Sequence, residues 1–288
     1  MYKFIILIFI FSIVFNYQLI IGKNKKLSFS KNELTFFKKL LIKNFDKKFI
    51  AKLIKNKKFK KITGLTIQNI ATRGIGSNYS HFTDKYSINL AKKFKKKNKK
   101  ILNSVSKKYK LDKNLIVAIL LVESAFGKYK PNYIVFNVYA TLLIELRESM
   151  RNNYIPKILK AFPKMTKKEA KERLINKYNW AHNELLSLIK ILKKENLPSI
   201  FHIKGSFAGA IGLPQFLPSS FLNWGVDGNK DGKIRLYNKT DAIHSIANYF
   251  KNHGWINSLP EKDKLNIILE YNNSTDYASV IIKIIKMI

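Results

Sequence analysis

Hydrophobic residues recur every three or four positions along much of this chain, which is the spacing of one face of an α-helix. The longest such stripe follows Thr166 and ends before Pro198, and a second runs from Thr240 to Gly254. The apolar positions of the long stripe are Leu174, Tyr178, Ala181, Leu185, Ile189 and Leu192. Strand-like alternation is scarce, so the pattern predicts a mainly α fold.

Two of the predicted helix starts carry a capping box, in which a hydroxyl and a carboxylate three residues later satisfy backbone donors. Ser30 is followed by Glu33 in this way, and Thr166 is followed by Glu169. Both helices are therefore expected to begin at these residues.

The segment Leu115–Val122 is apolar at every position, and a helix that is apolar all round is buried. Asp112 is a suitable N-cap, and Glu123 falls in the last turn, before Gly127. Burial and the negative end of the helix dipole should both raise the pKa of Glu123, which would make it a proton donor at neutral pH. The alternative is a structural carboxylate held by a buried Arg or Lys.

Residues 205–224 combine small residues with polar and aromatic ones. Glycines and alanines let the backbone approach a ligand, Ser206 and Gln215 offer uncharged hydrogen-bonding groups, and phenylalanines offer flat apolar faces. These are the properties of a sugar-binding segment. A plain loop between helices is the alternative.

The composition is strongly basic, with 54 Lys and Arg against 18 Asp and Glu among 288 residues and a formal charge of +36. Lysine supplies nearly all of the positive charge. Runs such as residues 92–100 are interpreted as solvated helix faces, with attraction to an anionic polymer as the alternative. A nucleic-acid partner is not expected, because the arginine forks and stacking features of such proteins are missing.

The first residues carry one lysine and then an apolar run from Phe4 to Phe15. Residues 1–22 are expected to be a signal peptide or an N-terminal membrane anchor, and residues 23–288 the catalytic domain. The chain contains no cysteine, which excludes an N-terminal lipid on Cys, disulfides and thiolate metal sites. We expect an exported protein of the periplasm or cell envelope, possible attachment to the inner membrane, and a monomer.

The motifs VESAFG at 122–127 and GSFAGAIGLPQFLPSSFLNW at 205–224 together resemble the lytic murein transglycosylase B family, which has a lysozyme-like fold. Residues 82–94, 135–143, 245–250 and 270–278 resemble further segments of that family. One departure is visible: the family often has paired arginines after the helix at 135–143, and this chain has only Arg147 and Arg151 there.

The resemblance implies a function and a set of site residues. Glu123 corresponds to the single catalytic carboxylate, Ser206 and Gln215 to contacts with the substrate and that acid, and Tyr249 and Tyr271 to cleft residues. The family cleaves the bond between N-acetylmuramic acid and N-acetylglucosamine in peptidoglycan glycan strands and closes a 1,6-anhydro ring. We find no second carboxylate motif of the kind that ordinary glycosidases need. A hydrolytic muramidase and a catalytically silent wall-binding protein remain the alternatives.

Residues 227–238 place oxygen-bearing side chains at loop positions 1, 3 and 5 and a glycine at position 6, as in an EF-hand-like calcium loop. Some family members extend this loop by three residues, which here reaches residue 241. The expected structural Ca²⁺ ligands are Asp227, Asn229, Asp231, the carbonyl of Lys233, and Asp241. A turn without metal is the alternative. No organic cofactor is expected.

Overall fold

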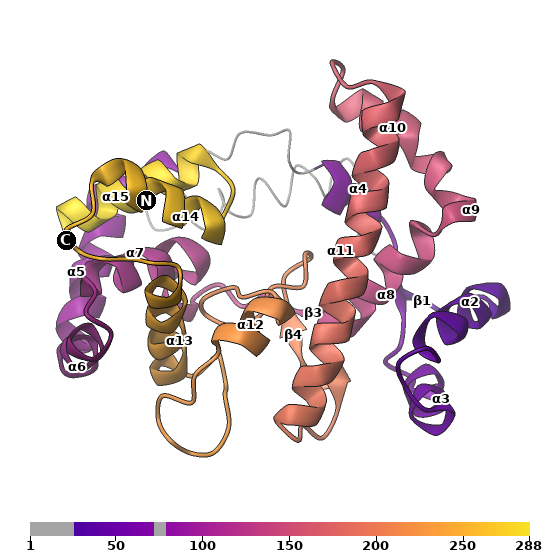
Figure 1. Cartoon of the computed structure of the whole chain (residues 1–288), viewed down its shortest axis with the longest axis horizontal. Helices are drawn as coiled ribbons and strands as arrows, with labels where there is room; N and C mark the ends of the chain where they lie inside the picture. Colours follow the sequence, from indigo (N-terminus) through magenta and orange to yellow (C-terminus); the bar gives the residue numbers. More distant parts are fainter. Residues whose placement is uncertain (1–25, 72–78) are drawn as a thin grey trace, which may run out of the picture. The chain divides into compact units, whose positions relative to one another are not determined.

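The structure is a computed structural model that describes residues 26–71 and 79–288. Over these residues the chain is mainly α-helical, with two antiparallel pairs of very short strands (Figure 1). The predicted fold class is thus confirmed. The expected signal peptide or anchor at 1–22 lies outside the described residues. Within the described ranges no helix is both long and apolar enough to cross a bilayer.

The chain divides into two compact units, each built from two separate stretches of sequence. Of the described residues, unit 1 contains 26–71 and 132–209, and unit 2 contains 79–131 and 210–288. The expected catalytic domain over residues 23–288 would contain both units, and it stays a prediction.

Unit 1 is organised around two helices, α8 and α11, which pack against each other. Ten of the eleven residues of α8 are buried, so this helix is the centre of the unit. The elements of unit 1 are β1 (Lys26–Leu27), α2 (Lys31–Leu41), α3 (Lys47–Lys55), β2 (Lys61–Ile62), α4 (Leu65–Ala71), β3 (Tyr133–Ile134), α8 (Val135–Glu145), α9 (Glu148–Arg151), η4 (Asn152–Tyr154), α10 (Ile155–Ala161), α11 (Lys167–Lys194), η5 (Ile200–His202) and β4 (Lys204–Gly205).

The sequence accounts well for the helix starts and for the buried face of α11. Both predicted capping boxes are present, at Ser30 for α2 and at Thr166 for α11. The predicted stripe of α11 faces the core, with Leu174, Ala181 and Leu185 among its buried residues. The helix ends at Lys194, before Pro198, as expected.

The segment after β4 is fixed tightly within unit 1. β4 pairs with β3, with Tyr133 opposite Gly205. The hydroxyl of Tyr139 donates to the carbonyl of Ala208 at 3.2 Å. Gly209 has a φ of +82°, and a Cβ built there would lie 2.3 Å from the Tyr139 hydroxyl. Only glycine therefore fits this position without displacing a buried tyrosine.

Unit 2 is organised around α7, the predicted apolar helix. Residues Leu115–Leu121 of α7 are all buried, and α5, α6, α13 and α15 pack against the helix. The elements of unit 2 are η2 (Ser80–Thr83), α5 (Lys85–Lys97), α6 (Lys99–Tyr109), α7 (Lys113–Ser124), η3 (Ala125–Gly127), α12 (Pro218–Trp224), α13 (Lys239–Asn252), α14 (Glu261–Tyr271) and α15 (Thr275–Met287). The predicted helix between Thr240 and Gly254 corresponds to α13.

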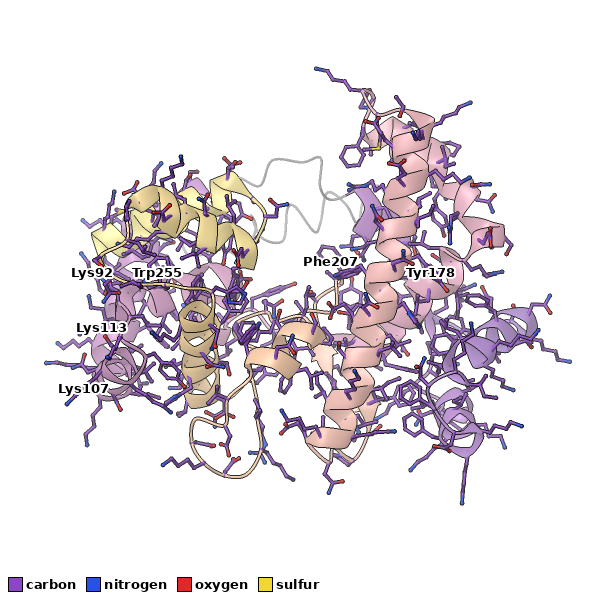
Figure 2. The ribbon with its side chains drawn as sticks, viewed as in Figure 1. Lys92, Lys107, Lys113, Tyr178, Phe207 and Trp255 are labelled. Atoms are coloured by element: carbon purple, nitrogen blue, oxygen red, sulfur yellow. The ribbon has the colours of Figure 1, made fainter. Side chains whose placement is uncertain are left out.

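The hairpin of α5 and α6 presents a strongly basic surface. No acidic residue occurs between Asp84 and Asp112, and the lysines of the run 92–100 are mostly exposed. Figure 2 shows Lys92 and Lys107 on this part of unit 2. The hairpin therefore carries uncompensated positive charge next to the buried α7.

Candidate active site

Glu123 lies in the last turn of α7, as the sequence predicts. Asp112 caps the start of the helix by accepting from the backbone N–H of Asn114 at 2.8 Å. After Ser124 the chain turns through three consecutive residues with left-handed backbone, at φ +46°, +60° and +87° for residues 125, 126 and 127. The helix therefore ends one residue after the acid, and Gly127 is the last of three left-handed positions, not the only one.

The sharp turn after Glu123 is supported by side-chain packing within unit 2. The rings of Phe94 and Phe126 stack with centroids 4.1 Å apart. A Cβ at Gly127 would lie 2.8 Å from the Leu213 side chain, so the end of α7 closely approaches the segment that follows residue 210. These contacts fix the direction in which the acid projects.

Glu123 is partly buried, and this environment favours its neutral form. Burial raises its pKa from 4.5 to about 7, while a hydrogen bond from Tyr277 opposes the rise. A carboxyl group with a pKa near neutrality can both donate and accept a proton at physiological pH. This is the property that the sequence predicts for Glu123.

Tyr277 is the direct partner of Glu123 and was not predicted. Its hydroxyl donates to Oε1 of Glu123 at 2.6 Å, and only 1% of its surface is exposed. It belongs to the motif at 270–278, from which the sequence pointed to Tyr271. The detectable signal is its position on the apolar stripe of α15, which indicates burial but not contact with α7.

Tyr271 and Tyr249 lie beside this pair in an aromatic cluster. The rings of Tyr271 and Tyr277 are parallel, with centroids 6.4 Å apart. Tyr249 packs edge-on against Tyr271 at 4.9 Å and stacks on His253 at 3.8 Å. Burial raises the pKa of all three tyrosines, so their hydroxyls stay protonated and can act as hydrogen-bond donors.

Gln215 lies in a tight loop that the aromatic cluster supports. Ile211 and Phe216 pair through two backbone hydrogen bonds, of 2.7 and 3.1 Å, and enclose the loop. Gln215 has a left-handed φ of +50°, and its Nε2 donates to the carbonyl of Gly212 at 2.7 Å. The Tyr271 hydroxyl donates to the carbonyl of Pro214. A chain of contacts therefore joins this loop, through the tyrosines, to Glu123.

Ser206 belongs to unit 1, whereas Glu123, Gln215, Tyr249 and Tyr271 belong to unit 2. Ser206 follows β4 directly, and its carbonyl accepts from the N–H of Gly209 at 2.9 Å. Its neighbour Phe207 is labelled in Figure 2, and Asn69 donates to the Phe207 carbonyl at 2.9 Å. A contact of Ser206 with substrate stays a prediction.

The predicted calcium loop folds back on itself through its own polar groups. The side-chain oxygens of Asp227 and Asn229 both accept from the N–H of Asp231 at 3.2 Å, so they converge on one point. Gly232 makes the turn with a φ of +82°. The guanidinium of Arg235 contacts Oδ2 of Asp231. These oxygens are therefore satisfied by backbone donors and by Arg235, and a Ca²⁺ ion in this loop stays a prediction.

Asp241 closes this loop from the first turn of α13. It is fully buried, and its Oδ1 accepts from the N–H of Gly228 at 3.0 Å and of Asn229 at 3.3 Å. Its Oδ2 accepts from the N–H of Arg235 at 2.8 Å. Asp241 therefore fixes the loop through backbone donors. In the described part of the chain, no three His, Asp or Glu side chains form a metal-ligand cluster.

Arg147 and Arg151 cap the end of α8 in unit 1. Arg147 donates to the carbonyl of Ile144, and Arg151 Nε donates to the carbonyl of Leu146 at 3.1 Å. Arg151 also lies over the ring of Tyr178 at 5.5 Å. Their contacts within unit 1 are structural.

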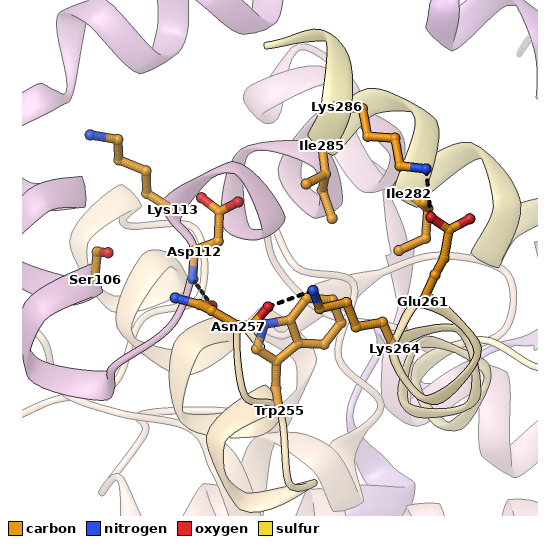
Figure 3. Close-up of a pocket in the computed structure, with 10 residues that line it drawn as sticks. All are labelled: Ser106, Asp112, Lys113, Trp255, Asn257, Glu261, Lys264, Ile282, Ile285 and Lys286. Atoms are coloured by element: carbon orange, nitrogen blue, oxygen red, sulfur yellow. Dashed lines mark hydrogen bonds and ion pairs between the residues drawn. The ribbon is translucent and has the colours of Figure 1, made fainter. Parts of the chain in front are cut away.

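A cavity of about 540 Å³ lies at the opposite end of α7 from the acid (Figure 3). Asp112, Trp255 and Asn257 line it. The side-chain oxygen of Asn257 accepts a hydrogen bond from the Asp112 N–H at 2.7 Å. Eleven residues of helix separate Asp112 from Glu123, which at 1.5 Å per residue is about 16 Å. This cavity is therefore separate from the acid and its tyrosines.

The helical fold matches solved structures closely. Soluble lytic transglycosylase SltB1 from Pseudomonas aeruginosa superposes with a TM-score of 0.68 at 20% identity, covering 88% of this chain and 97% of that chain. Lytic transglycosylase Slt35 of Escherichia coli, in a complex with calcium, gives 0.65 at 20% identity over 92% and 95% of the two chains. The protein therefore has the lysozyme-like helical fold of soluble lytic transglycosylases, as predicted.

The family follows from the sequence. The family model described as "Transglycosylase SLT domain" matches residues 29–262, which is most of the chain, so the protein belongs to this family. The membrane-bound lytic murein transglycosylase B of Escherichia coli strain K12 is 32% identical over 155 residues. The match covers 54% of this chain and 35% of that protein, so the matched part spans about one third of the relative's length.

Proposed function

We propose that this protein is a lytic transglycosylase that cleaves the β-1,4 bond between N-acetylmuramic acid and N-acetylglucosamine in peptidoglycan. The observation that carries the proposal is Glu123, a partly buried acid with a pKa of about 7 whose Oε1 accepts from Tyr277 at 2.6 Å. Membership of the transglycosylase family agrees with this reaction.

The reaction needs one group that first donates and then accepts a proton. Protonated Glu123 gives its proton to the glycosidic oxygen, and the bond from this oxygen to C1 of the muramyl residue breaks. The carboxylate then takes the proton of the muramyl 6-hydroxyl while O6 bonds to C1, which closes the 1,6-anhydro ring and restores the acid. Because Tyr277 occupies Oε1, the proton is carried by Oε2.

The environment of Glu123 among the described residues favours ring closure over hydrolysis. Retaining and inverting glycosidases place a second carboxylate about 5–10 Å from the acid. Within the residues that the structure describes, the pKa of Glu123 responds to burial and to Tyr277, and no second carboxylate contributes. A hydrolytic muramidase would need such a group, and a silent wall-binding protein would not need the raised pKa.

Mass spectrometry of the products tests the proposal directly. Purified sacculi digested by the wild type should release fragments that end in 1,6-anhydromuramic acid, lighter by one water than hydrolytic fragments. Glu123→Gln should lose activity by ~10²–10⁴-fold, because the amide cannot transfer the proton. Glu148→Gln, at an exposed acid of α9, is the matched control and should keep full activity. Fragments with a reducing muramic acid as the main product would refute the transglycosylase reaction.

Ser206, Gln215, Tyr249 and Tyr271 are proposed to bind the glycan strand. Gln215 and the two tyrosines are connected to Glu123 by the contacts of the aromatic cluster. Ser206 joins this set on its sequence motif alone. Replacing any of the four by alanine should raise KM before it lowers kcat.

We further propose that the loop 227–241 binds a structural Ca²⁺. Asp227, Asn229, Asp231 and the carbonyl of Lys233 would supply oxygen ligands and Asp241 would close the shell, so the ion would fix the start of α13. Slt35, which shares the fold, was crystallised with calcium. Millimolar Ca²⁺ should raise the melting temperature of the wild type by mass action but not that of Asp231→Ala. If millimolar Ca²⁺ leaves the melting curves of the wild type and of Asp231→Ala equally unchanged, the proposed calcium site is contradicted.

The location of the protein is also a proposal. Glycan strands of the wall lie outside the cytoplasm, so residues 1–22 would act as an export signal or an anchor, and the protein would work in the periplasm or envelope. The relative named above is described as membrane-bound. We expect a monomer, which sedimentation of the purified chain would check.

A further inference from the structure

The cavity of about 540 Å³ at the start of α7 has no part in the proposed reaction. Its lining comes from the helices α6, α7, α14 and α15 and from the segment after α13, so it belongs wholly to unit 2 (Figure 3). Cavities of about 300–1,000 Å³ accommodate small ligands. The cavity is therefore large enough to hold a ligand of its own.

Trp255 brings a buried hydrogen-bond donor to this cavity. Only 2% of the residue is exposed, and its indole N–H has no acceptor among the described residues. Figure 3 draws the indole in the middle of the lining side chains, and the Lys264 ammonium lies 5.9 Å from the centre of the ring. Buried donors in folded proteins nearly always have an acceptor. A ligand oxygen that reached the indole would supply the missing one.

The charged groups of the lining favour an anionic ligand. Lys113 and Lys264 donate to neutral acceptors at 2.6 Å each, and neither has an ion-pair partner in the described part of the chain. Both carboxylates of the lining are already engaged, since Glu261 pairs with Lys286 and Asp112 caps α7. Two positive charges and one indole donor are thus available to an oxygen ligand such as phosphate.

Two exposed apolar side chains flank the same cavity. Ile256 is 54% exposed and lies between the lining residues Trp255 and Asn257, while Met287 is 44% exposed and follows the lining residue Lys286. They are two of the six large apolar side chains that are exposed within the described ranges. Exposed apolar groups next to basic ones are typical of surfaces that bind membranes.

We propose that this face of unit 2, the docking face, binds a membrane surface and holds the phosphate of an anionic phospholipid in the cavity. The phosphate oxygens accept from the indole N–H of Trp255 and from the two free lysines. The hydroxyls of a glycerol headgroup donate to Asp112, and the two exposed apolar side chains enter the acyl region. The folded unit makes this contact itself, so the site is distinct from any anchor at residues 1–22 and does not depend on the proposed reaction.

The test uses a fluorophore at a single position, which the cysteine-free chain allows. Ile256→Cys, labelled with an environment-sensitive dye in the full chain, reports whether the docking face enters a bilayer, whatever else holds the chain there. Its emission should move to shorter wavelength with vesicles of phosphatidylcholine mixed with phosphatidylglycerol, and not with phosphatidylcholine alone. The matched control is Ile42→Cys, at an exposed isoleucine of unit 1, whose emission should not change.

Variants of the lining test the phosphate contacts in the chain labelled at position 256. Lys113→Gln with Lys264→Gln should raise the lipid concentration at half-maximal shift by about tenfold to thirtyfold, the effect of two lysines at an anionic surface. Trp255→Phe keeps an aromatic ring against Phe250 and should raise that concentration about tenfold through the lost donor. Lys38→Gln with Lys48→Gln removes two exposed lysines of unit 1 and should change it by less than about twofold.

Several results would overturn the docking face. The label at position 256 could stay in water with the anionic vesicles, enter neutral vesicles equally well, or respond to lipid as before in the double lysine variant. A shift with glycerol phosphate alone would assign the cavity to a soluble phosphate compound, and a shift with purified sacculi would assign it to the wall. Loss of glycan cleavage, by contrast, would bear only on the proposed function.

Discussion

Replacing Glu123 by glutamine should stabilise the protein, and the gain should grow with pH. Burial raises the pKa of the folded group from 4.5 to about 7. Below pH 4.5 the acid is neutral in both the folded and the unfolded chain, so burial of the neutral carboxyl group contributes its full amount to stability. As pH rises through 7 that contribution is lost, because the unfolded chain ionises freely and the folded chain must bury a charge.

The size of the effect follows from the same values. One pKa unit corresponds to about 1.4 kcal/mol, so the full difference is about 3 kcal/mol, reduced to about 2–3 kcal/mol because Glu123 is partly exposed. Glutamine has the same shape, accepts the Tyr277 hydrogen bond and never ionises. For chains of this size 1 kcal/mol shifts the melting temperature by about 2–4 °C. Above pH 7.5 Glu123→Gln should therefore melt about 4–12 °C above the wild type.

Thermal unfolding of both proteins between pH 4 and 8.5 measures this difference. The two melting temperatures should nearly coincide at pH 4 and separate as pH rises toward 7. Glu148→Gln, an exchange at an exposed acid, should show no such divergence. If the difference in melting temperature between Glu123→Gln and the wild type is constant across this pH range, the inference that Glu123 is buried in its neutral form is refuted.

Three further outcomes are expected. Tyr277→Phe removes a hydrogen bond that lowers the pKa of Glu123, so the alkaline limb of the kcat/KM profile should move to higher pH by about one unit while kcat falls. Glutamines in place of the lysines in 92–100 should weaken binding to sacculi at low salt and leave turnover of a short glycan unchanged, since exposed charges act over about 10 Å at 0.1 M salt. Gly209→Ala should lower the free energy of unfolding by about 2–4 kcal/mol through strain and a clash with Tyr139, against about 1 kcal/mol for Gly254→Ala, where the φ is +81° and the space is open.

The burial of the helix that ends in Glu123 could be predicted from the sequence by itself, because a run of eight apolar residues requires no knowledge of the rest of the fold. The catalytic role expected for Glu123 came instead from the resemblance of two motifs to a known family. Local signals also sufficed for the capping boxes and for the extent of α11 and α13. The end of α7 was predicted less well, since two non-glycine residues adopt left-handed backbone before Gly127.

The partner of the acid could not be predicted because it comes from a distant helix. Tyr277 is 154 residues from Glu123, and nothing in its local pattern distinguishes it from Tyr271. Both tyrosines occur in the same short motif, and the hydrogen bond of Tyr271 goes instead to the carbonyl of Pro214. The division of the chain into two interleaved units is equally invisible in the hydrophobic pattern.

The arrangement of α7 and α15 also determines when this protein can become active during its synthesis. α7 is apolar on every face, and α15, which packs against it, is made much later in synthesis. At about 5–20 residues per second, the 154 residues between acid and tyrosine take about 8–30 s to translate. During this time α7 lacks one of its covering helices and the acid lacks its hydroxyl donor. A nascent chain that has not yet reached α15 therefore carries no assembled acid, and a chain cut short before α15 would be both inactive and prone to aggregate.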